Sequence, residues 1–129
     1  MLNLKNASGA VVSHNVYWLS ADGDYNAING LSGSSVSTTI LKSEKFNSES
    51  RWSFKIINNS GKIAFFIRPR LLMKGEEVLP SYWTGSYFTL APGESVTESV
   101  TCPNQKLKDK SYTLQGKGLN TNEINIKIN

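Results

Sequence analysis

The feature that most constrains this chain is an alternation of apolar and polar side chains with a period of two residues. The segment 51–58 (RWSFKIIN) shows it clearly, because Trp52, Phe54 and Ile56 fall on one face. The segment 124–128 (INIKI) repeats it near the C-terminal end. Successive side chains of an extended strand point to opposite faces, so this pattern is typical of strands with one buried face. A helical period is almost absent, and the sequence therefore predicts an all-β fold.

Short runs of turn residues separate the apolar segments, as at Asn58-Asn59-Ser60-Gly61. About seven to nine short strands at this spacing predict an antiparallel β-sandwich, with a β-barrel as the alternative. Residues 1–4 are expected to be a ragged end. The predicted strands are 11–19, 36–46, 51–58, 63–73, 87–90, 95–102, 111–116 and 123–128.

Two of these strands carry more specific predictions. The strand 63–73 is expected to form a hairpin with 51–58 across the tight connection between them. In 63–73, Phe65, Ile67 and Leu71 share one face, and the arginines share the other. Pro69 has no N–H to donate to a ladder, so we expect an edge or a bulge at this point.

Length and charge limit the classes of protein. The 129 residues fit one domain, taken as 1–129. The net charge of +4 is scattered, and the densest basic stretch, 106–110, alternates with other residues. A nucleic-acid binder gathers its positive charge into a patch, so no nucleic-acid partner is predicted. No segment approaches the roughly 20 apolar residues of a membrane span.

The acidic residues do not form a pair suited to catalysis. Glycoside hydrolysis needs two carboxylates that face one another. Asp22 and Asp24 lie in a turn-rich loop, and Glu76 and Glu77 are neighbours whose side chains point to opposite sides of an extended chain. We therefore expect solvated turn charges and no catalytic residue.

The chain has one histidine and one cysteine, which leaves no spacing typical of a zinc site and no nucleotide-binding motif. His14 lies inside a strand pattern and is expected to be a partly buried structural residue. Cys102 lies among valines and is expected to be a small buried hydrophobic residue. The sequence therefore predicts no metal-binding or cofactor-binding residue.

An aromatic stretch is the feature that could make an external contact. It contains Tyr82, Trp83, Tyr87 and Phe88, interrupted by a proline and a glycine that place part of it in a loop. Three interpretations are open. The favoured one is that Trp83 covers one end of the core; the second is that the rings fill an interface between domains, and the third is that they stack on sugars.

Three motifs carry a family resemblance: N-V-Y-W-L-S at 15–20, A-F-F-I-R at 64–68 and L-A-P-G-E-S at 90–95. With these motifs, the chain resembles the C-terminal immunoglobulin-like domain of family 2 glycoside hydrolases of the exo-β-glucosaminidase and β-mannosidase type. Relatives commonly carry W-S-D-N-Y where this chain has W-T-G-S-Y at 83–87, which removes an Asp and an Asn from that loop. Tyr17 and Trp18 are expected to supply large buried area on an early strand.

The resemblance implies an immunoglobulin-like sandwich that is a fragment of a larger retaining exo-β-glycosidase. Such enzymes act on β-glucosaminides, β-mannosides or β-galactosides, and hold two catalytic glutamates in a TIM-barrel domain. No residue here matches those glutamates, so this chain is expected to be a non-catalytic accessory domain beside the barrel and other sandwich domains, possessing no cofactor. The implied parent is bacterial and periplasmic or secreted. The candidate contacts with sugar or with a neighbouring domain are Tyr82, Trp83, Tyr87 and Arg68, the last as partner of a carboxylate from that domain.

Two alternatives belong to other classes of protein. One is a free-standing carbohydrate-binding module that binds an oligosaccharide through the loop aromatics. The other is an adhesive or scaffolding immunoglobulin-like domain unrelated to any glycosidase. A sandwich fold alone does not decide among them, because sandwiches host many functions.

Overall fold

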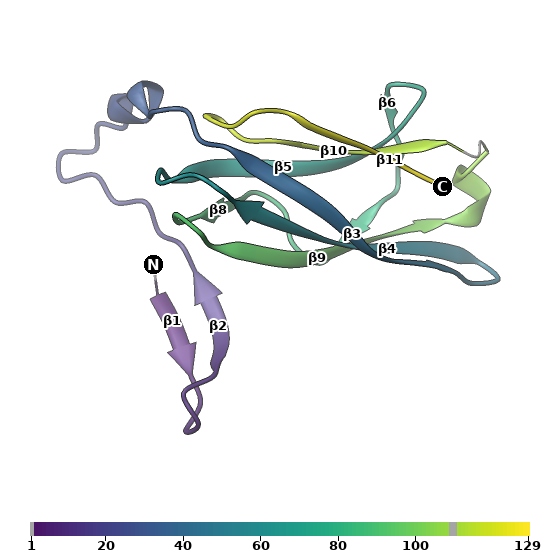
Figure 1. Ribbon diagram of the computed structural model, residues 1–129, viewed down its shortest axis with the longest axis horizontal. Coiled ribbons are helices and arrows are strands. Elements are labelled where there is room, and N and C mark those ends of the chain that lie inside the picture. Colours follow the sequence, from purple (N-terminus) through teal and green to yellow (C-terminus); the bar gives the residue numbers. More distant parts are fainter. Residues whose placement is uncertain (1, 109–110) are drawn as a thin grey trace. The chain divides into compact units, whose positions relative to one another are not determined.

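The computed structural model describes residues 2–108 and 111–129, and strands dominate it (Figure 1). It divides into two compact units, the first ending at Leu31 and the second beginning at Ser32. No helix among the described residues has the length and apolar character needed to cross a bilayer. The elements are β1 Leu2–Lys5, β2 Val11–Asn15, η1 Asn26–Gly30, β3 Val36–Lys45, β4 Glu49–Asn58, β5 Ala64–Met73, β6 Glu76–Glu77, β7 Tyr82–Trp83, β8 Phe88–Leu90, β9 Ser95–Pro103, η2 Asn104–Lys106, β10 Tyr112–Lys117 and β11 Ile124–Ile128.

The first unit contains a two-stranded hairpin of β1 and β2, followed by an extended segment and the short helix η1. The side chain of Asn6 shapes the hairpin turn, because its Oδ1 accepts hydrogen bonds from the backbone N–H groups of Ser8 and Ala10. The prediction of a ragged end at residues 1–4 was wrong for residues 2–4, which are paired. The predicted strand 11–19 ends at Asn15.

The aromatic residues that follow β2 also differ from the prediction. Tyr17 is exposed and Trp18 is only partly buried. The expectation that this pair supplies large buried area on an early strand was therefore wrong for Tyr17. The chain leaves the extended strand before these residues, so no sheet face is available to cover them within the first unit.

The second unit is a two-sheet sandwich. One sheet has the order β3-β4-β9-β7, and the other has the order β11-β10-β5-β6, with β8 also paired to β5. These orders match the A-B-E-D and G-F-C-C′ sheets of an immunoglobulin fold. Nine described strands, β3 to β11, build the sandwich, and every strand pair in it is antiparallel. The all-β, immunoglobulin-like prediction is confirmed.

Both sheets contribute to one core. Trp52, Phe54 and Ile56 face inward from β4, as the alternation predicts, and Ile67 and Leu71 face them from β5. Burying a side chain of this size contributes roughly 1.5–3 kcal/mol. The period-two pattern thus assigned the buried faces of both strands correctly.

The predicted hairpin between 51–58 and 63–73 was wrong. β4 pairs with β3 and β9, whereas β5 pairs with β10, β6 and β8 in the opposite sheet. Asn58 explains the crossing, because it is fully buried and its Nδ2 donates to the carbonyls of Lys62, Leu90 and Ala91. Its Oδ1 accepts from Ser60. These bonds hold the connection between β4 and β5, and the residues at the end of β8, against the end of β4.

Pro69 lies where β5 lacks a strand partner on one side. On that side β8 pairs with β5 as far as Ile67, and β6 begins pairing at Leu72. On the other side Pro69 lies opposite Gly116 of β10. The expectation of a local edge at Pro69 is confirmed, and the bulge in this strand lies earlier, before Ile67.

Candidate functional site

The structure places the four sequence-predicted contact residues in two locations. Tyr82 and Trp83 form β7 at the edge of one sheet, paired with Thr101 and Val100 of β9. Arg68 lies on β5 of the other sheet, and Tyr87 precedes β8, which pairs with β5. The structure therefore brings Arg68 and Tyr87 together and leaves the other two apart from them.

Trp83 packs against the core. Its ring meets Phe54 edge to face at 6.0 Å between centroids, and its Nε1 donates to Ser81 Oγ at 3.0 Å. The indole is partly buried, so it covers the core at the edge strand, as the structural interpretation of Trp83 expects. Tyr82 points the other way and is exposed.

An arginine–aromatic cluster, made of Phe66, Arg68 and Tyr87, lies on the outer side of β5. The Arg68 guanidinium carbon lies 5.9 Å from the centroid of the Tyr87 ring, and that ring lies 5.3 Å from Phe66. Phe66 is 47% exposed and Tyr87 is 50% exposed. Sequence reasoning did not name Phe66, although the alternation that places Phe65 and Ile67 inward also places Phe66 on the face of the arginines.

Both aromatic residues of this cluster have a strained backbone conformation. Phe66 has a φ of 58° and Tyr87 a φ of 57°. This left-handed conformation costs a bulky residue roughly 1–2 kcal/mol, and such strain gathers at functional sites. Phe66 lies in the bulge of β5, where its N–H donates to the Thr89 hydroxyl at 3.2 Å. About half of each ring remains exposed within this chain.

Lys74 also has a positive φ, but the reason is different. It lies beside Gly75 in the two-residue connection between β5 and β6, and both residues have φ above +50°. A two-residue hairpin turn of the primed type requires this geometry. The strain at Lys74 is therefore explained by its turn.

Arg68 has a carboxylate partner in its own chain. Its Nη2 lies 3.1 Å from both carboxylate oxygens of Glu77 on β6. Both side chains are partly exposed, and an ion pair of this kind contributes roughly 0–1 kcal/mol. The pair fixes the guanidinium beside the Tyr87 ring, where a partner would meet a preformed cationic and aromatic surface.

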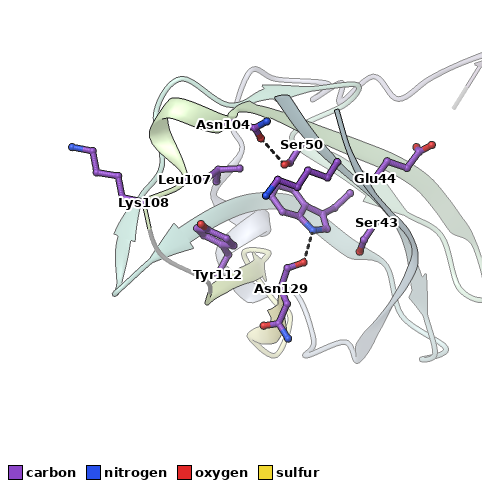
Figure 2. A pocket seen from close by; sticks show the side chains of 10 residues that line it. Ser43, Glu44, Ser50, Asn104, Leu107, Lys108, Tyr112 and Asn129 are labelled. Atoms are coloured by element: carbon purple, nitrogen blue, oxygen red, sulfur yellow. Dashed lines mark hydrogen bonds between the residues drawn. The ribbon is translucent and has the colours of Figure 1, made fainter. Parts of the chain in front are cut away.

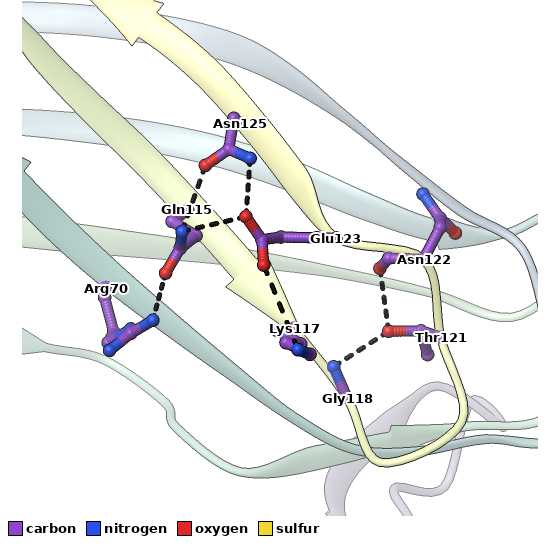
Figure 3. A network of polar contacts seen from close by, with 8 residues as sticks. All are labelled: Arg70, Gln115, Lys117, Gly118, Thr121, Asn122, Glu123 and Asn125. Atoms are coloured by element: carbon purple, nitrogen blue, oxygen red, sulfur yellow. Dashed lines mark hydrogen bonds and ion pairs between the residues drawn. The ribbon is translucent and has the colours of Figure 1, made fainter. Parts of the chain in front are cut away.

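The neighbouring part of the same sheet face carries a polar network (Figure 3). Gln115 accepts a hydrogen bond from Arg70 and donates to Glu123 and to Asn125, each at 3.1 Å. Lys117 lies 4.0 Å from Glu123. These groups satisfy one another, so the arginine–aromatic cluster is bordered by polar side chains that already have partners.

A pocket of about 570 Å³ opens at the other end of the sandwich, where the last residues of β3 meet the first of β4 and β10. Figure 2 shows Asn104 and Ser50 joined by a hydrogen bond of 2.7 Å at its wall. Among the described residues that line it, Glu44 is the only acidic side chain. A pocket with one carboxylate does not supply the opposed pair of a glycosidase. Its walls come from separate segments, which no local motif reveals.

The loop between β7 and β8 packs closely against Glu98 of β9. A Cβ atom added to Gly85 would lie 2.5 Å from Glu98 Oε1. Glu98 stands in the inward register of β9, and the Thr84 hydroxyl donates to its carboxylate. Gly85 therefore leaves room for Glu98, and an aspartate at this position would bring two carboxylates together.

The remaining candidate residues fall as follows. Asp22 and Asp24 are exposed turn residues, and hydrogen bonds from Ser20 and from the Asp24 N–H lower the pKa of the Asp22 carboxyl. His14 is exposed and bonded to Asn3, so the prediction of a partly buried histidine was wrong: its hairpin has no covering layer within the first unit.

Cys102 is fully buried, as predicted, and desolvation raises the pKa of its thiol, opposed in part by the charge of Lys106. In the described part of the chain, no three His, Cys, Asp or Glu side chains gather as metal ligands would.

The fold and this surface define an immunoglobulin-like sandwich domain with a strained, exposed arginine–aromatic cluster. The family model for the exo-β-D-glucosaminidase Ig-fold domain matches residues 15–121. The chain therefore belongs to that family of domains.

Known proteins extend this result. An exo-β-D-glucosaminidase of Arthroderma benhamiae is 30% identical over 136 aligned positions, which cover 90% of this chain and 15% of that protein. The exo-chitosanase CsxA of Amycolatopsis orientalis superposes with a TM-score of 0.84 at 25% identity, over 96% of this chain and 17% of that one. CsxA has also been solved in complex with PNP-β-D-glucosamine. The chain thus spans about one sixth of the length of these relatives.

A FixG-related protein of Vibrio parahaemolyticus shares the fold alone. It is 13% identical, with a TM-score of 0.51, and the match covers 72% of this chain and 92% of that one. The same sandwich thus makes up most of that solved chain, and a shared sandwich does not by itself imply a shared function.

Proposed function

We propose that this chain is the non-catalytic accessory domain of a longer retaining exo-β-D-glucosaminidase, packed beside a TIM-barrel catalytic domain. The observation that carries the proposal is the family match over residues 15–121, in a chain that spans 15–17% of its matched relatives. Catalysis would then reside in the part of the protein outside this chain. The role of the 129-residue chain is to support and border the catalytic domain.

The arginine–aromatic cluster is our candidate for the contact with that domain. A half-exposed phenylalanine and tyrosine held by strain, with a guanidinium between a ring and a carboxylate, suit a protein interface in which Tyr and Arg are enriched. An acidic group on the catalytic domain could take the N–H donors of Arg68 that Glu77 does not use.

The proposed substrate class is β-D-glucosaminides. The family description and the complex of CsxA with PNP-β-D-glucosamine support it. The β-mannosides and β-galactosides that the resemblance also implies have no supporting observation among these comparisons.

Hydrolysis of nitrophenyl glycosides tests the proposal. We expect no product from the 129-residue chain, and release from nitrophenyl β-D-glucosaminide by the longer polypeptide that contains it. The nitrophenyl β-mannoside and β-galactoside are the matched controls. Turnover by the short chain that is lost on Glu44→Gln would contradict the proposal, as would a longer polypeptide inactive on all three.

The docking role is tested by substitutions in the longer polypeptide. Arg68→Gln combined with Tyr87→Ser should uncouple the unfolding of this domain from that of the catalytic domain, seen as two separated transitions in calorimetry. The control is Arg70→Gln, which removes a charge two residues along the same face, outside the cluster. Equal effects of the two changes would contradict a specific role for the cluster.

A carbohydrate-binding module is the second candidate, because exposed aromatic rings stack on sugars. Its supporting observation is the exposure of Phe66 and Tyr87. A chain of net charge +4, with Arg68 beside the rings, disfavours a sugar that carries an amine. Calorimetric titration with glucosamine oligomers should show no heat of binding, whereas binding lost in Tyr87→Ala and kept in Tyr82→Ala would favour this candidate.

A further inference from the structure

The hairpin of β1 and β2 is exposed throughout. All nine residues of the two strands are exposed, including Leu2 at 66% and Leu4 at 64%. Val11 and Val12, at the bulge of the hairpin, are exposed to a similar extent. A globular unit normally buries one face of a β-ribbon with this many apolar side chains.

The two faces of the hairpin differ in chemistry. Leu2 pairs with Asn15 and Leu4 with Ser13, so the two leucines share one face. Asn3 lies on the other, where its side chain bonds that of His14 at 2.5 Å. The leucine face thus carries two leucines from β1 and, opposite them, the polar side chains of Asn15 and Ser13 from β2.

Both outer edges of the hairpin are also open. The sheet it forms has only β1 and β2 among the described residues, so every second backbone N–H and C=O points away from the partner strand. An isolated two-stranded hairpin is marginal in water. Open edges and two uncovered leucines together are features of a sheet fragment.

The solved structure of CsxA contains a counterpart of part of this hairpin. The match to CsxA covers 96% of this chain, which leaves about five residues unmatched, fewer than the fourteen that precede the family match. At least part of the hairpin therefore has a counterpart in CsxA. The remaining 83% of that protein lies outside the match and is available to cover it.

We infer that residues 2–15 are two strands of a second β-sheet, whose other strands belong to a neighbouring domain of the same longer polypeptide. The neighbour supplies an edge strand that pairs with the hairpin and an apolar layer that covers Leu2 and Leu4. This inference rests on the proposal that the chain is part of a longer enzyme. It makes the hairpin a covalent and structural tie between the two domains.

Hydrogen–deuterium exchange tests the inference directly. In the 129-residue chain, we expect the amides of residues 2–5 and 11–15 to exchange rapidly. In the longer polypeptide, they should be protected at least about 100-fold more, including the alternate amides that the hairpin itself leaves unpaired. Fast exchange in both proteins overturns the inference.

Protection of these amides in the 129-residue chain would also overturn the inference if the protection rises with protein concentration and sedimentation shows a dimer. The hairpin would then be covered by a second copy of the chain. Protection in the short chain as a monomer overturns it too, since the hairpin would need no neighbour.

A substitution pair provides the second test. Leu4→Asn in the longer polypeptide should lower its Tm by several degrees and leave the Tm of the 129-residue chain unchanged. Asn3→Gln, on the opposite face, is the control and should change neither. An equal effect of Leu4→Asn in both proteins contradicts a neighbouring domain as the covering layer.

The outcomes separate this inference from the proposed function. A longer polypeptide that hydrolyses β-glucosaminides but leaves the hairpin unprotected defeats the inference alone. One that protects the hairpin but hydrolyses no glycoside defeats the proposed function alone.

Discussion

Trp52 on β4 and Tyr112 at the start of β10 meet across the two sheets, with ring centroids 5.8 Å apart and planes inclined by 50°. In antibody domains, a disulfide joins these two strands, and a tyrosine stands near the start of the second of them. This chain has a single cysteine, so a packed aromatic pair occupies the region instead. The pair links the sheets by apolar burial, because both rings are almost fully buried.

Removing either ring should destabilise the sandwich strongly. We expect Trp52→Ala to lower the free energy of unfolding by about 3–5 kcal/mol, the usual cost of a large cavity in a core. Urea unfolding followed by circular dichroism measures it. Tyr82→Ala removes an exposed ring and should change it by less than about 0.5 kcal/mol. Comparable losses at the two positions would show that Trp52 is not part of the core.

The buried Asn58 should be among the most sensitive polar positions. Replacing it by Leu removes this donor from the carbonyls of Leu90 and Ala91, and each buried unpaired group costs about 1–3 kcal/mol. The carbonyl of Lys62 keeps a hydrogen bond from the Ser60 hydroxyl. We expect a loss of at least about 2 kcal/mol in urea unfolding. The neighbouring Asn59→Leu is the control, since its side chain bonds only Ser37 Oγ among the described groups and is exposed. If Asn58→Leu were neutral, the account of the β4–β5 crossing would be wrong.

Because the backbone at Phe66 has a positive φ, glycine should be tolerated there better than alanine. Both Phe66→Gly and Phe66→Ala remove the ring, but glycine adopts a φ of 58° without the Cβ clash. The glycine variant should therefore be more stable than the alanine variant, by about 1 kcal/mol. At Thr39, an exposed position of β3 without a positive φ, the order should reverse, because glycine weakens ordinary strands. Thermal unfolding of the four variants checks both orders.

Gly85 and Glu98 should be energetically coupled. Gly85→Asp places a second carboxylate against Glu98 and should destabilise the domain by about 1 kcal/mol. In a Glu98→Gln background, part of this cost should disappear, since glutamine removes the charge repulsion and keeps the size of the side chain. A double-mutant cycle measures the coupling, and strict additivity of the two changes would contradict it.

Cys102 should make stability fall at alkaline pH. Burial raises the pKa of its thiol, so the folded chain keeps a proton that the unfolded chain has lost. Unfolding releases this proton, and the stability contribution is complete below the ordinary thiol pKa, roughly 8.5, and is lost as the pH rises above it. The difference in unfolding free energy between wild type and Cys102→Ala should change across this pH window. A difference independent of pH would show that the thiol titrates normally.

The period of the side-chain pattern allowed much of the fold to be predicted. It identified the inward residues of β4 and β5, the all-β class, and the strands of the sandwich except the two-residue β6 and β7, because burial of one face imposes alternation locally. Alternation names the face of a strand but carries no information on its partner. The hairpin assigned to 51–58 and 63–73 failed for this reason, since the bonds of Asn58 direct the chain to the opposite sheet.

The candidate site, too, was predicted only in part from the sequence. Arg68 and Tyr87 could be named from the sequence as contact residues, because Arg and aromatic side chains have chemistry suited to an interface. Their contact with each other, and the contact of the Phe66 ring with Tyr87, depend on a β-bulge and two positive φ values. By itself, the sequence determined which residues avoid water and which motifs mark the family. Only the tertiary structure decided which strands pair, which rings meet and which hairpin is left uncovered, because these depend on contacts between residues far apart in the chain.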